Sequence, residues 1–413
     1  MDLIKLCENA VSAKSSIINY SEEFKNKCLT AVADALVASS EYIISENAKD
    51  YKKGQDNNMK AGLLDRLLLN EKRIADMAEG LKQIVNLPDP IGEVLETFDR
   101  PNGMKIEKTR VPLGVIGIIY ESRPNVTADA FGLTFKTGNV VILKGGSDAI
   151  NSNIAITNTI RDALSKEGAD PDVINLISDT DRAVTKEFMK MKKYVDVLIP
   201  RGTAKLIQTV VEESNIPVIE TGSGNCHIYI DKDADINKVI PIVVNAKTQR
   251  IGVCNACESL VVHKDADKNI LKEVAKALRE KDVEIRGDKD AVLCIDCNEA
   301  TEEDYGTEYL DLIISVKTVG SVEEAIEHIN KYSTGHSECI ITENKEAAEK
   351  FLKLVDSACV YHNVSTRFTD GFEFGFGAEI GISTQMLHAR GPMGLKELTT
   401  YKYKIRGNGQ IRQ

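Results

Sequence analysis

The stretch VPLGVIGIIY, residues 111–120, decides the fold class of this chain. Before it, segments such as 26–43 and 63–85 repeat apolar residues at helical spacing. After it, short β-branched apolar runs take over: NVVIL (139–143), VINLI (173–177), VDVLI (195–199) and PVIE (217–220). Helical patterns, among them 151–168 and 202–215, separate these runs. Continuously apolar strands joined by crossover helices predict an α/β fold with a buried parallel sheet.

A second α/β domain is predicted after Cys254. The strand-like runs there are SLVVH (259–263), LIISVK (312–317) and ECIIT (338–342), and helical patterns at 268–281 and 321–332 alternate with them. The tail, residues 398–413, looks like a lone basic strand. Because an unpaired strand edge is a template for pairing with another chain, we expect a homo-oligomer.

Composition narrows the class of protein. The chain has 413 residues, of which 42% are hydrophobic and 28% charged, so two or three globular domains are expected. Its net charge of −11 argues against nucleic-acid or anionic-membrane partners. Asp2, Lys5 and Glu8 interrupt the N-terminus, which excludes an apolar signal segment there. Nine cysteines, an odd number, suit reduced thiols, so we expect a cytoplasmic protein.

The segment KTQRIGVCNACESLVVH, residues 247–263, holds Cys254 and Cys257 in a C-x-x-C spacing. Cys294 and Cys297 form a second such pair. The 36 residues between the pairs exceed the roughly 15–20 of a compact four-cysteine zinc site, and Cys294 lies in an apolar, strand-like run. No redox-domain pattern supports a catalytic dithiol. The sequence therefore predicts no metal site.

A nucleophilic cysteine is the alternative. Such a residue needs an electropositive, partly exposed setting and nearby donors for an oxyanion. Arg250 precedes Cys254 by four residues, Gly252 permits close approach of a substrate, and Asn255 is polar. Cys257 adjoins a predicted strand and is expected to pack against it. These local features alone do not decide whether Cys254 is a nucleophile.

Longer blocks carry a resemblance. IETGSGNCHIYID (219–231) places Glu220 at a strand end 34 residues before Cys254, a pattern similar to the aldehyde dehydrogenase superfamily. Residues 120–149, QRIGVCNA (249–256) and the C-terminal block 365–412 resemble the branch of that superfamily that reduces γ-glutamyl phosphate. The likeness spans nearly the whole chain. It implies that Cys254 is the nucleophile and Cys257 structural.

The resemblance also implies a reaction. L-Glutamyl 5-phosphate and NADPH give L-glutamate 5-semialdehyde, NADP⁺ and phosphate through a cysteine thioester, a step of proline biosynthesis. An acyl phosphate is activated, so a thiolate can displace phosphate without a general acid. Two alternatives stay open: a CoA-acylating aldehyde dehydrogenase, and a zinc-stabilised regulatory protein that uses the two C-x-x-C pairs.

Three catalytic positions are implied. Cys254 forms the thioester, and its backbone N–H and the amide of Asn125 are the expected oxyanion donors. A turn role for Asn125 after Pro124 is the alternative. Glu220 matches the glutamate that activates water in hydrolytic relatives, and here we expect it to position groups or to manage the cysteine proton.

The cofactor residues are implied in the same way, because no G-x-G-x-x-G fingerprint is present. Lys144 is expected to reach the adenosine ribose and its phosphate. Gly202 and Thr203 begin a helix whose N-terminus can meet the pyrophosphate. Glu308 falls where the superfamily holds the nicotinamide ribose. Solvated surface positions are the alternatives for Lys144 and Glu308.

Ser147 bears on the choice of cofactor. NAD-preferring relatives carry an acidic residue three positions after the strand-end lysine, whereas a serine there can donate to a 2′-phosphate. Ser147 therefore favours NADPH. The neighbouring Asp148 is expected to face away and to cap the following helix.

The substrate's carboxylate and phosphate need cationic or hydroxyl partners. The candidates are Arg123, Arg250, Ser365, Thr366 and Arg367.

The implied architecture has two α/β domains with parallel sheets and a small β oligomerisation element. An NADP-binding domain takes 1–98 and 112–222, a catalytic domain takes 223–388, and the oligomerisation element takes 99–111 and 389–413. Because no amino-acid kinase segment precedes the reductase, glutamate 5-kinase is a candidate transient partner.

Overall fold

The computed structural model describes residues 2–412, which form two compact units. Of the described residues, 2–220, 375–381 and 393–412 form unit 1, and 221–374 and 382–392 form unit 2. No individual helix in the described chain is long and apolar enough to cross a membrane; only the bent pair Glu22–Ala38 and Ser40–Asp56, taken together, meets those criteria.

Unit 1 contains a parallel sheet in the order β5-β4-β3-β6. Its strands are β3 (Val115–Tyr120), β4 (Val140–Gly145), β5 (Ile174–Leu176) and β6 (Val197–Arg201). Every residue of β3 and β4 is buried, as the continuous apolar runs predict. The run 217–220 contributes only one bridge, Leu198 to Val218, beside β6.

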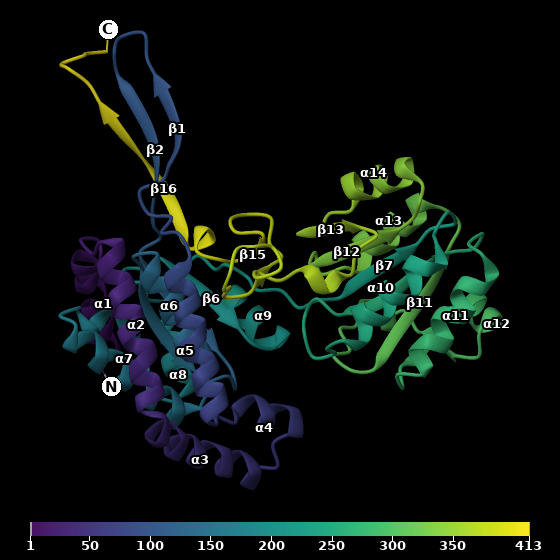
Figure 1. Cartoon of the computed structure of the whole chain (residues 1–413), viewed down its shortest axis with the longest axis horizontal. Coiled ribbons are helices and arrows are strands. Elements are labelled where there is room, and N and C mark those ends of the chain that lie inside the picture. The colour runs from purple at the N-terminus through teal and green to yellow at the C-terminus, as the bar shows by residue number, and fades with distance from the viewer. Residues whose placement is uncertain (1, 413) are drawn as a thin grey trace. The chain divides into compact units, whose positions relative to one another are not determined.

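Helices surround this sheet (Figure 1). They are α1 (Leu3–Ile17), α2 (Glu22–Ala38), α3 (Ser40–Asp56), α4 (Ala61–Leu67), α5 (Glu71–Asn86), α6 (Asn125–Lys136), α7 (Ile150–Lys166), α8 (Arg182–Phe188) and α9 (Ala204–Glu213). The helical pattern at 63–85 is broken into α4 and α5. Asn70 causes the break, because its side chain accepts a hydrogen bond from the Arg73 N–H at 2.9 Å and caps α5.

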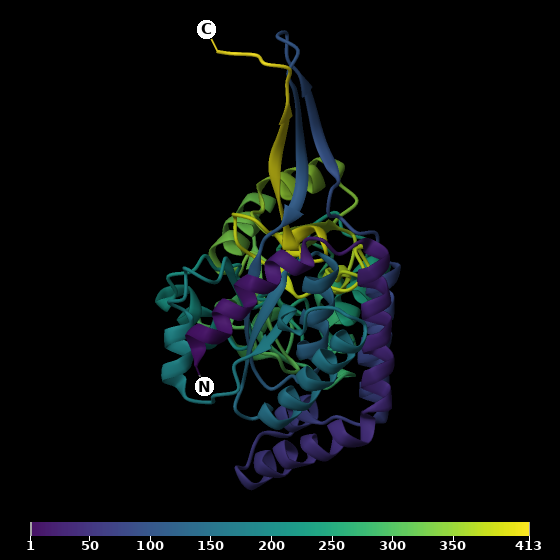
Figure 2. The ribbon, with the colours of Figure 1, turned by 90° about the vertical axis from the view of Figure 1, so that its left-hand side faces the viewer.

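An antiparallel sheet in the order β1-β2-β16 also belongs to unit 1. It consists of β1 (Val94–Asp99), β2 (Lys105–Pro112) and β16 (Thr399–Arg406). These strands reach away from the helices and the parallel sheet of the unit (Figures 1 and 2). The C-terminal strand is thus not alone within the chain, since β16 pairs with β2 from Thr399–Pro112 to Arg406–Lys105.

Unit 2 is built on a parallel sheet in the order β10-β9-β11-β8-β7-β12-β13. The strands are β7 (Cys226–Ile230), β8 (Cys257–His263), β9 (Glu284–Gly287), β10 (Asn298–Glu299), β11 (Ile313–Val319), β12 (Ser337–Ile341) and β13 (Cys359–His362). The helices are α10 (Ile236–Thr248), α11 (Lys268–Arg279), α12 (Lys289–Cys294), α13 (Val322–Tyr332) and α14 (Lys345–Leu354). Short strands β14 (Ile382–Ser383) and β15 (Gly391–Pro392) pair with each other.

Both faces of this sheet are buried. Ile228 and Ile230 of β7 pack in one apolar cluster with α10 and α11, whereas Tyr229 packs in another with α13 and α14. This alternation follows from the two-residue period of a strand. Cys294, expected in a strand, instead ends α12, whose N-terminus is capped by the Asp288 carboxylate.

Candidate active site

Cys254 lies in the loop 249–256, which joins α10 to β8. The loop passes so close to Gly224 that a Cβ built there would lie 1.4 Å from the Cys254 carbonyl oxygen. The Cys226 thiol donates to the same carbonyl at 3.2 Å. Burial raises the pKa of Cys226, which keeps it protonated and able to donate. The start of β7 therefore fixes the position of Cys254.

A buried ion pair holds the two ends of this loop. The Lys247 ammonium and the Glu258 carboxylate are 2.5 Å apart, and both side chains are fully buried. The N–H of Leu310 donates to the other Glu258 oxygen at 3.2 Å. Burial raises the pKa of Glu258 to about 7, while Lys247 lowers it. Removing one partner of such a pair would leave an uncompensated buried charge, so the pair constrains where the loop begins and ends.

The two cysteines of the C-x-x-C segment have different environments. Cys257 is the first residue of β8, is fully buried, and donates to the Ser259 carbonyl at 3.4 Å. Burial raises its pKa, which disfavours the thiolate that nucleophilic attack requires. Cys254 is only half-buried. Of the two, Cys254 is suited to attack a substrate. Within residues 2–412, no three His, Cys, Asp or Glu side chains gather as metal ligands would.

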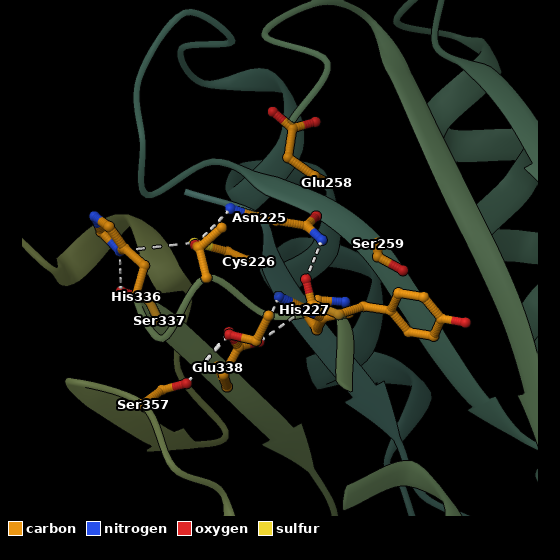
Figure 3. Close-up of polar contacts among 12 residues, drawn as sticks. Asn225, Cys226, His227, Glu258, Ser259, His336, Ser337, Glu338 and Ser357 are labelled. Carbon is orange, nitrogen blue, oxygen red and sulfur yellow. Dashed lines mark hydrogen bonds and ion pairs between the residues drawn. The ribbon is translucent and has the colours of Figure 1, made fainter. Parts of the chain in front are cut away.

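Behind Cys226 lies a buried polar network (Figure 3). The His336 Nδ1 lies 3.7 Å from the Cys226 Sγ and 2.7 Å from the Ser337 hydroxyl. The Glu338 carboxylate accepts from the backbone N–H of His227 at 2.7 Å and lies 3.1 Å from its ring Nδ1. These contacts join the start of β12 to the start of β7, the strand on which the Cys254 loop packs.

Glu308 belongs to the same neighbourhood. Its carboxylate accepts a hydrogen bond from the Gly224 N–H at 2.7 Å, and burial raises its pKa, while that bond and His336 lower it. Glu308 is therefore half-buried beside the glycine that contacts Cys254, rather than solvated on the surface.

The substrate candidates of unit 2 lie on two segments. Arg250 is exposed in the Cys254 loop, and Arg367 lies in the short 3₁₀ helix Thr366–Phe368. The Ser365 hydroxyl donates to the Asn245 side-chain oxygen at 2.7 Å, and the Thr366 hydroxyl donates to the Asn255 carbonyl at 2.8 Å. Both hydroxyl protons are thus used within the protein, and a direct role of these two residues in binding substrate stays a prediction.

In unit 1, most of the predicted site residues lie at or just after the carboxyl ends of three neighbouring strands. Tyr120 of β3 pairs with Gly145 of β4 and with Arg201 of β6, so the loops after these strands start at one sheet edge. Lys144 is 5% exposed there, and its ammonium donates to the Gly145 carbonyl at 3.1 Å. Burial lowers its pKa, while Asp179 raises it. Lys144 is therefore not a solvated strand-end lysine. The carboxyl edge is where open α/β sheets bind ligands.

The N-terminus of α9 has an acidic neighbour. Thr203 caps the helix, and its backbone N–H donates to the Glu121 carboxylate at 2.9 Å. A Cβ on Gly202 would lie 2.5 Å from the same carboxylate. Glu121 thus contacts the helix end at which a phosphate is expected.

The prediction that Asp148 caps α7 is wrong. Asp148 accepts a hydrogen bond from the Ser122 hydroxyl, and α7 has no capping side chain of its own. Instead Asp50 of α3 accepts from the backbone N–H groups of Asn151 and Ser152. Ser147 is exposed in the turn after β4.

Asn125 is exposed as the first residue of α6, and its amide donates to the Asp129 carboxylate at 3.0 Å. Burial raises the pKa of Asp129 to about 6, while Asn125 and Arg201 lower it. Arg123 is half-buried just before α6. Glu220 is half-buried at the last residue of unit 1.

The candidates thus form two groups, one on each unit. Unit 2 holds Cys254, Glu308, Arg250, Ser365, Thr366 and Arg367, and unit 1 holds Arg123, Asn125, Lys144, Ser147, Gly202, Thr203 and Glu220. Reasoning from sequence missed Cys226, which contacts the Cys254 carbonyl, and Glu121, which contacts the N-terminus of α9. Cys226 directly follows the glycine-rich turn, which is the one signal that pointed toward it.

Comparison with known proteins places the chain in a family. Residues 1–301 and 306–403 match the aldehyde dehydrogenase family. The gamma-glutamyl phosphate reductase of Lachnospira eligens is 62% identical over 390 residues, 94% of each chain. That of Agathobacter rectalis is 55% identical over 416 residues, which cover 100% of both chains.

Structural similarity agrees with this. The crystal structure of gamma-glutamyl phosphate reductase from Thermotoga maritima matches with a TM-score of 0.98 and 47% identity, covering 100% of both chains. The chain belongs to the aldehyde dehydrogenase family and, within it, to the gamma-glutamyl phosphate reductases.

Proposed function

We propose that the chain reduces L-glutamyl 5-phosphate to L-glutamate 5-semialdehyde and phosphate with NADPH, as a step of proline biosynthesis. The full-length similarity to reductases of this name, at 55–62% identity, is the observation that carries the proposal. Cys254, half-buried in a loop held by Gly224 and Cys226, supplies the nucleophile in this proposal.

In the proposed mechanism, the Cys254 thiolate attacks the acyl carbon of the substrate. A thioester forms, the bond from the acyl carbon to the phosphate oxygen breaks, and phosphate leaves. The backbone N–H of Cys254 and the amide of Asn125 stabilise the oxyanion that develops in this step. Arg123, Arg250 and Arg367 are the proposed cationic partners of the substrate's phosphate and carboxylate.

Glu220 is proposed to position groups or to manage the proton of Cys254. Activation of water by this residue would hydrolyse the thioester and defeat reduction.

The residues of unit 1 suit a phosphorylated nicotinamide cofactor. Lys144 is a buried cation whose hydrogen bond goes to a backbone carbonyl, and it lies at the ligand-binding edge of a parallel sheet. We assign Lys144 to the adenosine ribose and its phosphate, and Gly202 and Thr203 to the pyrophosphate. Glu308, a residue of unit 2, is proposed to hold the nicotinamide ribose. NADPH, when bound, supplies the hydride that reduces the thioester.

Ser147 supports NADPH over NADH, because it is an exposed hydroxyl where a carboxylate would repel a 2′-phosphate. Ser147→Glu is expected to shift the ratio of kcat/KM toward NADH, mainly through weaker NADPH binding. An unchanged ratio would show that the phosphate lies elsewhere.

Residues 1–98 and 112–222 are proposed as the NADP-binding domain and residues 223–388 as the catalytic domain of a cytoplasmic homo-oligomer. Residues 99–111 and 389–413, which contain most of β2 and all of β16, are the proposed oligomerisation element, since one edge of β16 lies at the border of its sheet. Glutamate 5-kinase is a proposed transient partner, because the acyl phosphate is labile.

The test is NADP⁺ reduction by the purified protein with glutamate semialdehyde, with and without phosphate. We expect turnover that depends on phosphate and does not respond to CoA. Turnover with CoA in place of phosphate would favour an acylating aldehyde dehydrogenase, and turnover with neither would indicate hydrolysis of the thioester.

A further inference from the structure

Arg367 is held by two neutral side chains. Its Nε–H donates to the Gln249 side-chain oxygen at 2.8 Å, and one Nη1–H donates to the side-chain oxygen of Asn255. A guanidinium has five N–H donors. Three of them therefore have no hydrogen-bond acceptor among residues 2–412.

The charge of Arg367 is also not neutralised. Within the described chain no carboxylate forms an ion pair with it, whereas Arg110, Arg161 and Arg390 each pair with one carboxylate and Arg286 pairs with two. Burial and the neighbouring Arg250 lower its pKa, while Cys254 and Asp370 raise it. A half-buried guanidinium beside a second arginine is an electrostatically unfavourable arrangement, and an anion relieves it.

Asn255 links this guanidinium to the nucleophile. Besides accepting from Arg367, its side-chain amide donates to the Thr369 carbonyl at 2.9 Å, and its backbone carbonyl accepts from Thr366 at 2.8 Å. Asn255 directly follows Cys254, so the residue that orients Arg367 also fixes the distance between the nucleophile loop and the segment 365–369.

The space beside Arg367 can admit a ligand. Within unit 2, Gln249 and Arg367 line a cavity of about 480 Å³ together with Asn245, Ser365, Phe368 and Glu373. The guanidinium therefore borders this cavity and also contacts Gln249 and Asn255 of the Cys254 loop.

We propose that Gln249 and Asn255 are positioning residues that orient Arg367 without neutralising it, so that its remaining N–H donors bind an anionic group of the substrate. This rests on the function proposed above. Two groups of that reaction fit a guanidinium: the phosphate and the α-carboxylate.

Gln249→Glu tests the proposal. Glutamate keeps the side-chain length and the acceptor oxygen but places a negative charge against Arg367. In the direction of NADP⁺ reduction, we expect the KM for phosphate or for glutamate semialdehyde to rise at least about tenfold, with kcat changed less than about threefold. The thermal midpoint should stay equal or rise, because an ion pair replaces a neutral hydrogen bond. Gln55→Glu, the same change at an exposed residue of α3 in unit 1, should alter neither KM.

The two KM values separate the two anions. A selective rise in the KM for phosphate assigns Arg367 to phosphate, and a selective rise in the KM for semialdehyde assigns it to the carboxylate. If both stay within twofold of the parent values in a folded Gln249→Glu variant, the proposal is overturned. A parent protein without phosphate-dependent turnover would instead overturn the proposed function.

Discussion

Substitution of Gly224 by alanine tests whether close backbone packing places the nucleophile. The new Cβ would lie 1.4 Å from the Cys254 carbonyl oxygen, 2.3 Å from its carbonyl carbon and 2.7 Å from its Cα. All three atoms are backbone, so no rotamer change can relieve the clash. A Cβ and a non-bonded heavy atom essentially never approach within 3.0 Å, so the Cys254 backbone or β7 must move by about 1.6 Å.

The expected loss follows from this displacement. Misplacing a reacting group by about 1 Å can reduce turnover about 100-fold, so Gly224→Ala should lower kcat/KM at least that much. Overpacking of this kind typically costs about 1–3 kcal/mol of stability, which leaves a folded protein to assay. Phosphate-dependent NADP⁺ reduction gives kcat/KM, and urea unfolding gives the free energy of unfolding.

Gly62→Ala is the matched control. It adds the same methyl group inside α4, where nothing lies within 4 Å, and should stabilise the protein by about 0.5–1 kcal/mol with activity unchanged. If Gly224→Ala keeps more than a third of the parent kcat/KM, the loop is not fixed by this contact, and the reasoning fails.

Three further outcomes are expected. Cys254→Ala should abolish turnover and keep NADPH binding, while Cys257→Ala should retain most activity; the reverse result in a kinetic assay would reassign the nucleophile. Glu121→Gln removes a negative charge from the N-terminus of α9 and should lower the Kd for NADPH severalfold, measured by fluorescence titration; a higher Kd would contradict the assignment of this helix end to pyrophosphate. Burial raises the pKa of Asp129 to about 6 in the folded protein, above the value of about 4 that an unfolded chain has. The folded state therefore binds the proton more tightly, and the free energy of unfolding should fall as pH rises from about 4 to 6. Asp129→Asn should remove that decline in urea titrations at pH 4.5 and 7, and an unchanged decline would assign it to other groups.

The parallel sheets could be predicted because their signal is local. β3, VIGIIY, is an uninterrupted apolar run, β4 begins with the run VVIL, and both strands are buried at every position. The break between α4 and α5 was harder, because apolar residues continue across it and only the capping by Asn70 marks it. The cap of α7 was missed for a different reason. Asp50, which accepts from Ser152, is 102 residues away in the chain, and no local pattern reports such a contact.

The candidate site also has residues that the local sequence identifies and residues that only the fold brings together. Cys254 and Lys144 stand in recognisable local contexts, a loop before a strand and the end of a strand. The neighbours that set their chemistry come from elsewhere: Cys226 lies 28 residues from Cys254, and Asn255 lies 112 residues from Arg367. Only the fold brings these pairs together, which is why the roles of Cys226 and Gln249 could not be read from the sequence.

The placement of the two groups on their sheets also explains their different chemistry. The cofactor candidates of unit 1 lie at or just after the carboxyl ends of β4 and β6, where the positive N-terminus of α9 suits phosphate. Cys254 instead precedes β8 and follows the C-terminus of α10, where the helix dipole is negative and disfavours a thiolate.

Lys247 is the basic residue in the last turn of α10, but its charge is neutralised by the ion pair with Glu258. It therefore does little to counter the negative end of the helix dipole near Cys254. Under the proposed mechanism, the exposed Arg250 of the same loop supplies positive potential to the thiolate. The neutral partners of Arg367 leave its charge available to the substrate anion, since a carboxylate in place of Gln249 or Asn255 would cancel that charge.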